Sequence, residues 1–200
     1  MAINLQKGQK VNLRKNSNAG LGEILVNLNW NARPINQGFF SNLFGGAGID
    51  LDLGCLYELK DGRKGSVQAL GNAFGALAYP PYVSLDGDDR TGASLSGENL
   101  RINGNQIANI KRILVYTFIY EGVANWKEAD ATVTVKYPGA EDLIIKMDDY
   151  NSYNTMCGLA LFENFNNETF SVEKIVQFYQ GHVELDRAFN WGLNWTPGRK

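Results

Sequence analysis

One short stretch of the chain, from Ser84 to Ile102, concentrates residue types that can bind a cation. It reads SLDGDDRTGASLSGENLRI, and its carboxylates are Asp86, Asp88, Asp89 and Glu98, without histidine or cysteine. Two carboxylates about 4 Å apart repel each other by roughly 4 kcal/mol at an effective dielectric constant near 20. Such crowding is tolerable in a solvated segment, or where a cation lies among the oxygens.

The chemistry of hard cations fits this composition, although the EF-hand pattern does not. Calcium takes six to eight oxygen ligands, and glycines such as Gly87 and Gly92 let a backbone bend closely around an ion. An EF-hand beginning at Asp86 would require an oxygen ligand where Arg90 stands and a glycine where Thr91 stands. The stretch is therefore not an EF-hand, and Arg90 is expected to clamp a carboxylate or to moderate the repulsion.

A second acidic pair, Asp50 and Asp52, precedes this stretch in IDLDLGCLYEL. On a strand the two side chains point the same way, roughly 7 Å apart, while the other face of the strand is continuously apolar. This pattern predicts a polar pocket beside the core, over which the glycine-containing loop can fold. From spacing alone, calcium binding and a solvated acidic surface both remain open.

Period-two alternation of apolar residues dominates the elements that must position these acids. It predicts strands at 23–30, 49–59, 113–120, 131–137, 142–147, 157–165 and 170–179, separated by turn sequences such as KDGRKG and YPGAED. Short helices are expected at 105–113 and in the closing segment HVELDRAFNWGL. Strands joined by turns favour an all-β fold, an antiparallel β-sandwich with one or two short helices, one of them C-terminal.

Length and composition limit the other possibilities. The 200 residues predict one domain, with residues 31–48 as a glycine-rich loop insertion and residues 196–200 as a flexible tail. A net charge of −2 argues against nucleic-acid binding, and no apolar run is long enough to span a membrane. The two cysteines, Cys55 and Cys157, are expected to be buried thiols of a cytoplasmic protein rather than a disulfide or a zinc site.

Several motifs resemble the TerD-like tellurium-resistance and stress proteins. The paired acidic signature of that family is similar to DLDL at 50–53 together with GDDRTG at 87–92. The family's opening resembles MAINLQKGQKVNL, and an early strand of the family resembles VNLNWNAR. Its closing strand and helix resemble FYQGHVELDRAFNWGL. The ending NWGLNWTPGRK and the insertion FFSNLFGG are similar to the TerA branch.

The resemblance implies a β-sandwich with Ca²⁺ near Asp50, Asp52, Asp88 and Asp89. Glu98 and Asn99 lie where the family has a second acidic cluster, and Asp86 belongs to the same stretch. The sequence departs from the family pattern after the RTG, where it reads ASLSG rather than further acids. The partners implied are other proteins of a stress or tellurium-resistance complex.

Catalysis is not expected, because the one histidine, His182, is predicted to have a cap or surface role at the start of the closing helix. The tryptophans are predicted to fill the core and its ends. Three hypotheses follow from the sequence. The first is a calcium-binding, non-catalytic stress module that acts through protein partners. The second is a calcium-dependent carbohydrate-binding sandwich, and the third is an interaction domain whose acidic loop is solvated.

Overall fold

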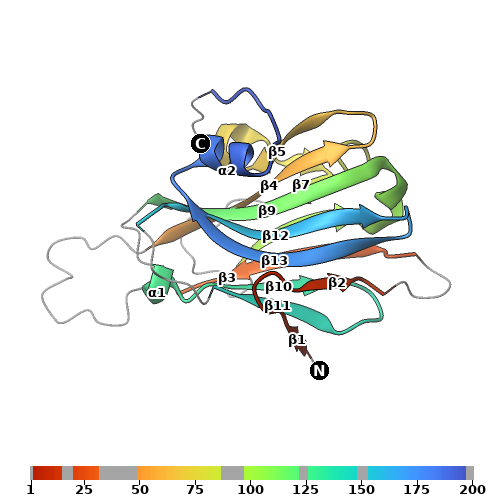
Figure 1. Ribbon diagram of the computed structural model, residues 1–200, viewed down its shortest axis with the longest axis horizontal. Helices are drawn as coiled ribbons and strands as arrows, with labels where there is room; N and C mark the ends of the chain where they lie inside the picture. The colour runs from red at the N-terminus through yellow and green to blue at the C-terminus, as the bar shows by residue number, and fades with distance from the viewer. Residues whose placement is uncertain are drawn as a thin grey trace, which may run out of the picture.

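The computed structural model describes residues 2–14, 20–31, 49–86, 97–121, 126–147 and 153–196. Within these ranges the strands form two sheets that pack face to face (Figure 1). The seven-stranded sheet has the order β1 (Ala2–Asn4), β11 (Asp142–Lys146), β10 (Thr132–Lys136), β3 (Glu23–Asn29), β8 (Glu98–Asn103), β7 (Val83–Leu85) and β6 (Gly75–Ala76). The six-stranded sheet has the order β2 (Lys10–Asn12), β13 (Thr169–Tyr179), β12 (Met156–Phe165), β9 (Ile110–Glu121), β4 (Asp50–Leu59) and β5 (Lys64–Gln68).

Neighbouring strands in the described part of the chain are antiparallel, apart from β1, which pairs parallel with β11. The expected all-β sandwich is therefore confirmed, with one parallel pair at its edge. The helices of the described ranges are short: α1 (Trp126–Ala129), α2 (His182–Ala188) and the 3-10 helices η2 (Leu70–Asn72) and η3 (Gly104–Asn109). Instead of the helix expected at 105–113, η3 ends at Asn109 and β9 begins at Ile110.

The main core lies between the two sheets and is built from the apolar positions that the alternation picks out. In β3, for example, Ile24, Val26 and Leu28 are fully buried, while the residues between them face outward. The core contains the side chains Leu51, Leu53 and Cys55 of β4, and Trp126 closes it at one end.

A second apolar cluster lies on the outer face of the six-stranded sheet, where it is covered by α2 and the residues that follow. Its buried members are Leu56, Leu114, Tyr116, Phe118, Met156, Tyr179, Leu185 and Trp191. Figure 1 shows α2 over this sheet, where the helix packs on β12 and β13. As a result β4 is buried on both faces, which differs from the solvent-facing polar side that its sequence predicts.

Candidate functional site

The first acidic pair, Asp50 and Asp52, is buried. Asp50 and Asp52 alternate with core residues of β4 and so point to the outer face, where Asp52 is fully buried and Asp50 is 8% exposed. Asp52 pairs in register with Phe118 of β9, a member of the outer cluster. The carboxylates thus lie in an interior setting rather than on a solvated surface.

A third buried carboxylate, that of Glu98, comes from the opposite sheet. Alternation along β8 turns Glu98 inward with Leu100 and Ile102, and the side chain is 2% exposed. Its Oε2 accepts a hydrogen bond of 2.5 Å from the backbone N–H of Leu53, just beyond the point where β5 stops pairing with β4 at Gly54. Glu98 therefore joins the two sheets beside Asp52.

Three buried carboxylate oxygens accept no hydrogen bond from the part of the chain that the structure describes. They are Asp50 Oδ1, Asp52 Oδ2 and Glu98 Oε1, and all three residues make other interactions. Among the described residues, no group of three or more His, Cys, Asp or Glu side chains is placed so that it could hold a metal ion by itself. A cation at this position would need ligands from elsewhere in the chain.

The described residues that border two segments, 32–48 and 87–96, lie at the same end of the sandwich as these acids. Trp30 Nε1 donates to Ile49 O at 2.9 Å, which places both borders of residues 32–48 together. Glu98 pairs in register with Leu28, and Asp86 N donates to Asn99 O at 3.0 Å, so the described residues on both sides of 87–96 lie here as well. The predicted site residues Gly87, Asp88, Asp89, Arg90 and Gly92 lie outside the described residues.

Gly97 lies in close contact with β3 at the start of β8. Its φ of +63° is a backbone conformation that favours glycine, and an added Cβ would lie 2.1 Å from the carbonyl oxygen of Leu28. A residue with a side chain cannot occupy this position without moving β3 or β8. The glycine therefore allows β8 to begin directly against β3, which sets the position of Glu98.

Two further predicted ligands, Asp86 and Asn99, face away from this group. Asp86 accepts two hydrogen bonds from Arg101, at 2.6 and 2.5 Å, and Arg101 also bonds to Glu23. The hydrogen bonds that Arg101 donates to Asp86, and then the bond that it donates to Glu23, raise the pKa of Arg101 above its ordinary value. The side-chain oxygen of Asn99 accepts a hydrogen bond of 2.9 Å from Asn27. By alternation Asn99 lies on the outer side of the seven-stranded sheet, opposite Glu98.

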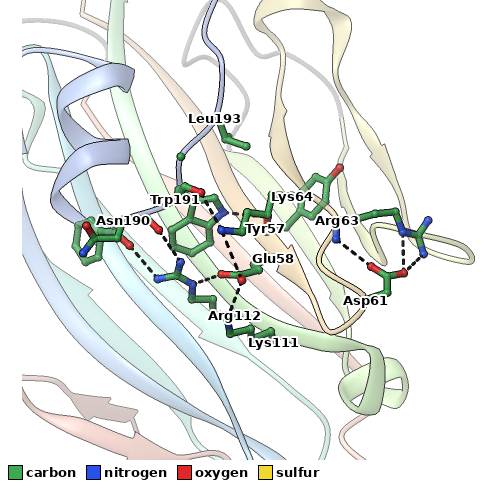
Figure 2. Close-up of polar contacts among 12 residues, drawn as sticks. Tyr57, Glu58, Asp61, Arg63, Lys64, Lys111, Arg112, Asn190, Trp191 and Leu193 are labelled. Carbon is green, nitrogen blue, oxygen red and sulfur yellow. Dashed lines mark hydrogen bonds and ion pairs between the residues drawn. The ribbon is translucent and has the colours of Figure 1, made fainter.

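A polar network that no sequence motif indicated holds the C-terminal segment on the outer face (Figure 2). Glu58 of β4 accepts hydrogen bonds from Lys111 at 2.7 Å and from Arg112 at 2.5 Å, and Lys64 lies 3.7 Å away. Burial by itself raises the pKa of Glu58, but the hydrogen bonds from Lys111 and Arg112 outweigh it and keep this pKa below its ordinary value. A buried carboxylate is here compensated by cations on neighbouring strands.

Arg112 also binds the chain that follows α2. It donates to the carbonyl oxygens of Phe189 and Asn190, at 2.9 and 3.2 Å, and its guanidinium lies 3.9 Å from the ring centre of Trp191. The Trp191 indole donates to the carbonyl oxygen of Tyr57 at 3.0 Å, and the side chain is almost fully buried. The closing segment is therefore part of the folded domain.

His182 at the start of α2 packs into the same layer. Its Nε2 lies 2.9 Å from Gln68 Oε1, which also accepts a hydrogen bond of 2.6 Å from the hydroxyl of Tyr116. The ring stands edge-on to Tyr116 and Phe118 and 4.8 Å from the ring of Trp195. Burial lowers the pKa of His182 to about 4, so the imidazole is neutral at pH 7.

The cysteines and the helices complete the description. Cys55 and Cys157 are buried thiols that are not joined in a disulfide, and burial raises the pKa of Cys55. Within the described ranges, no helix is long and apolar enough to cross a membrane.

Comparisons with known proteins place this arrangement in a family. The TerD domain model matches residues 1–169. Tellurium resistance protein TerA of Alcaligenes sp. is 44% identical over 183 residues, which cover 91% of this chain and 54% of that protein. Stress response protein SCP2 of Bacillus subtilis (strain 168) is 28% identical over 172 residues, covering 84% of this chain and 82% of its own length.

A solved structure supports the fold. The crystal structure of a homologue of the telluride resistance protein TerD from Streptomyces coelicolor A3(2) aligns with a TM-score of 0.58 at 18% identity, over 84% of this chain and 95% of that one. The resemblance stated from the acidic motifs is thus confirmed. This chain, which spans about half the length of its TerA relative, belongs to the TerD domain family of tellurium-resistance and stress-response proteins.

Proposed function

We propose that this chain is a calcium-binding, non-catalytic stress-response module that acts through protein partners in the cytoplasm. Membership of the tellurium-resistance and stress-response family supports the physiological setting. The observation that carries the calcium proposal is that buried carboxylates from both sheets reach the same stretch of β4, Asp52 from the strand itself and Glu98 through the backbone of Leu53. Asp52 is adjacent to Leu53, whose N–H binds Glu98, and the acidic loop leaves the sandwich at this same end.

Burying a charged side chain costs free energy. Moving an ionised carboxylate out of water costs several kcal/mol even after relaxation, unless opposite charge compensates it. Asp52 and Glu98 would increase this cost by repelling each other in a setting of low dielectric constant. A divalent cation offsets both terms at once, and Asp88 and Asp89 are the proposed ligands from the loop.

The donor set favours calcium over a transition metal. The proposed ligands are oxygens, which suit hard cations such as calcium. The softer donors are engaged elsewhere: Cys55 lies in the inter-sheet core and His182 packs against Gln68. Calcium also accepts the irregular geometry that a glycine-containing loop offers, whereas magnesium demands a near-ideal octahedron.

The chemistry of the thiols and the imidazole supports a role without catalysis. Both cysteines are buried and the pKa of Cys55 is raised, so thiolate nucleophiles are disfavoured. His182 is held at a structural hydrogen bond, and its pKa of about 4 makes it a poor general base at neutral pH. Partners are the remaining route by which such a module acts.

Calorimetric titration with calcium tests the proposal. Asp52→Asn, and separately the double variant Asp88→Asn with Asp89→Asn, are expected to weaken calcium binding by roughly tenfold or more, since affinity follows the charge of the ligand set. Asp61→Asn is the control, because Asp61 is exposed and paired with Arg63. If Asp52→Asn and the double variant bound calcium as tightly as wild type does, the ligand assignment would be contradicted. Glycan binding that requires calcium would instead favour the carbohydrate-binding hypothesis.

A further inference from the structure

A cavity of about 770 Å³ opens on the outer face of the six-stranded sheet, between α2, β5 and the chain that follows α2. Its size lies within the range of roughly 300–1,000 Å³ that is typical of small-molecule sites. The walls come from segments far apart in the sequence, since Gln68 and Leu70 line the cavity together with His182 and Trp195. The cavity is distinct from the end of the sandwich where Glu98 meets β4.

A buried amide supplies a polar group on the cavity wall. Gln68 is 7% exposed, and its Oε1 is occupied by the Tyr116 hydroxyl and by His182 Nε2. The amide N–H groups of Gln68 donate to none of the described residues, and they belong to a side chain that lines the cavity. A ligand with a hydrogen-bond acceptor can therefore use a donor whose orientation is already fixed.

One charged group on the cavity wall suits an anionic ligand. Arg187, in the last turn of α2, lines the cavity and has no acidic partner among the described residues. The carboxylate of Glu184 also lines the cavity, and its Oε2 accepts the backbone N–H of Gln180 at 2.6 Å. A guanidinium offers two parallel N–H donors, the geometry that a carboxylate matches.

The apolar part of the wall suits a flat ring. Trp195 is held in place because its Nε1 donates to Asp186 at 3.1 Å and its ring lies against His182. Leu70 and Val183 add apolar surface, and Val183 is 46% exposed. Aromatic rings prefer stacked or edge-on contacts with such a platform.

We propose that this cavity binds a small planar aromatic carboxylate, with the ring against Trp195 and Leu70, the carboxylate at Arg187 and an acceptor within reach of the Gln68 amide. The neutral state of the His182 imidazole fits this assignment, because the aromatic platform then carries no charge of its own at pH 7. The proposal does not depend on calcium, so it can fail or hold independently of the metal site.

The test uses the full chain, 1-naphthoate as the probe and 1-naphthalenemethanol as its neutral counterpart, in EDTA to exclude divalent metals. Two-dimensional ¹H–¹⁵N spectra report the Trp195 indole and the Gln68 side-chain amide, assigned with Trp195→Phe and Gln68→Glu. Saturable shifts of both signals with 1-naphthoate are expected. No saturable shift of these signals up to roughly 5 mM, a range in which ligands of even weak affinity saturate, would overturn the proposal.

Three variants make the result specific. Arg187→Gln is expected to weaken 1-naphthoate binding by at least about fivefold, the loss of a charge-assisted pair, and to leave 1-naphthalenemethanol binding unchanged. Val183→Trp fills the cavity and is expected to abolish binding of both compounds. Arg63→Gln, far from the cavity and paired with Asp61, is the matched control and should behave as wild type. Equal affinity of wild type and Arg187→Gln for 1-naphthoate, or full binding by Val183→Trp, would overturn the proposal.

Discussion

The packing of His182 makes the stability of this protein depend on pH in a defined window. In the folded protein burial lowers the pKa of His182 from 6.5 to about 4, whereas in the unfolded chain it returns to the ordinary value. Between these two values the unfolded state binds more protons than the folded state, so the free energy of unfolding falls as pH falls. The loss begins near pH 6.5 and is complete near pH 4.

The size of the loss in the free energy of unfolding follows from the two pKa values of His182. From about pH 7.5 to pH 5, the difference in proton binding lowers the free energy of unfolding by about 2 kcal/mol. The contacts of the ring that produce this effect are uncharged: Tyr116, Phe118, Trp195 and the Gln68 amide. Desolvation of the imidazolium is thus the physical cause.

Urea unfolding at a series of pH values measures this effect. Since His182 is the sole histidine of the chain, His182→Gln removes the whole contribution, and the difference between wild type and variant isolates it. We expect that difference to shrink by about 2 kcal/mol between pH 7.5 and pH 5. The imidazole also gives a single NMR signal, expected to titrate near pH 4. The described packing of α2 would be refuted if the His182 signal titrated near pH 6.5 and the free energy of unfolding had the same pH dependence in wild type and His182→Gln.

Two further substitutions test how the outer layer is held. Gly54→Ala places a Cβ 2.7 Å from the ring of Tyr116, so we expect the free energy of unfolding, measured with urea, to fall by about 1–3 kcal/mol. Gly181→Ala is the control, because its Cβ meets no atom within 4 Å and the variant should be nearly as stable as wild type. Arg112→Gln leaves the buried Glu58 with less compensation and frees two carbonyl oxygens, so we expect a loss of about 2–4 kcal/mol. Arg63→Gln, at an exposed ion pair, should leave the unfolding midpoint unchanged, and an equal loss in both arginine variants would contradict the special role of Arg112.

The strands with regular alternation could be predicted from the sequence, because one buried face leaves a period-two pattern. The strand expected at 49–59 is observed as β4 at Asp50–Leu59, and that expected at 170–179 as β13 at Thr169–Tyr179. The sandwich and the C-terminal helix were predicted on the same basis. Trp126 and Trp191, predicted to fill the core and its ends, are buried.

The strand β8 escaped prediction because its sequence was interpreted as part of one acidic loop. Glu98, Leu100 and Ile102 alternate inward, but a carboxylate at the first inward position hides the apolar pattern. The signal was present in ENLRIN, where Leu100 and Ile102 are two residues apart. Recognising it would have separated Glu98, which faces inward, from Asn99, which faces outward.

The burial of the outer face of the six-stranded sheet could not be predicted from β4 alone, because the segment that packs there comes from the other end of the chain. Trp191 contacts Tyr57, and His182 contacts Gln68, across more than a hundred residues. No local pattern specifies such pairs. Alternation predicted correctly that Asp50 and Asp52 share a face, but whether that face meets water depends on where α2 docks.

A crystal structure of the protein grown with calcium tests the central proposal most directly. We expect an ion with oxygens of Asp52 and Glu98, and of Asp88 or Asp89, at distances of about 2.4 Å. Calcium that binds only at other residues, or a structure in calcium in which Asp52 and Glu98 keep their positions with no ion between them, would contradict it.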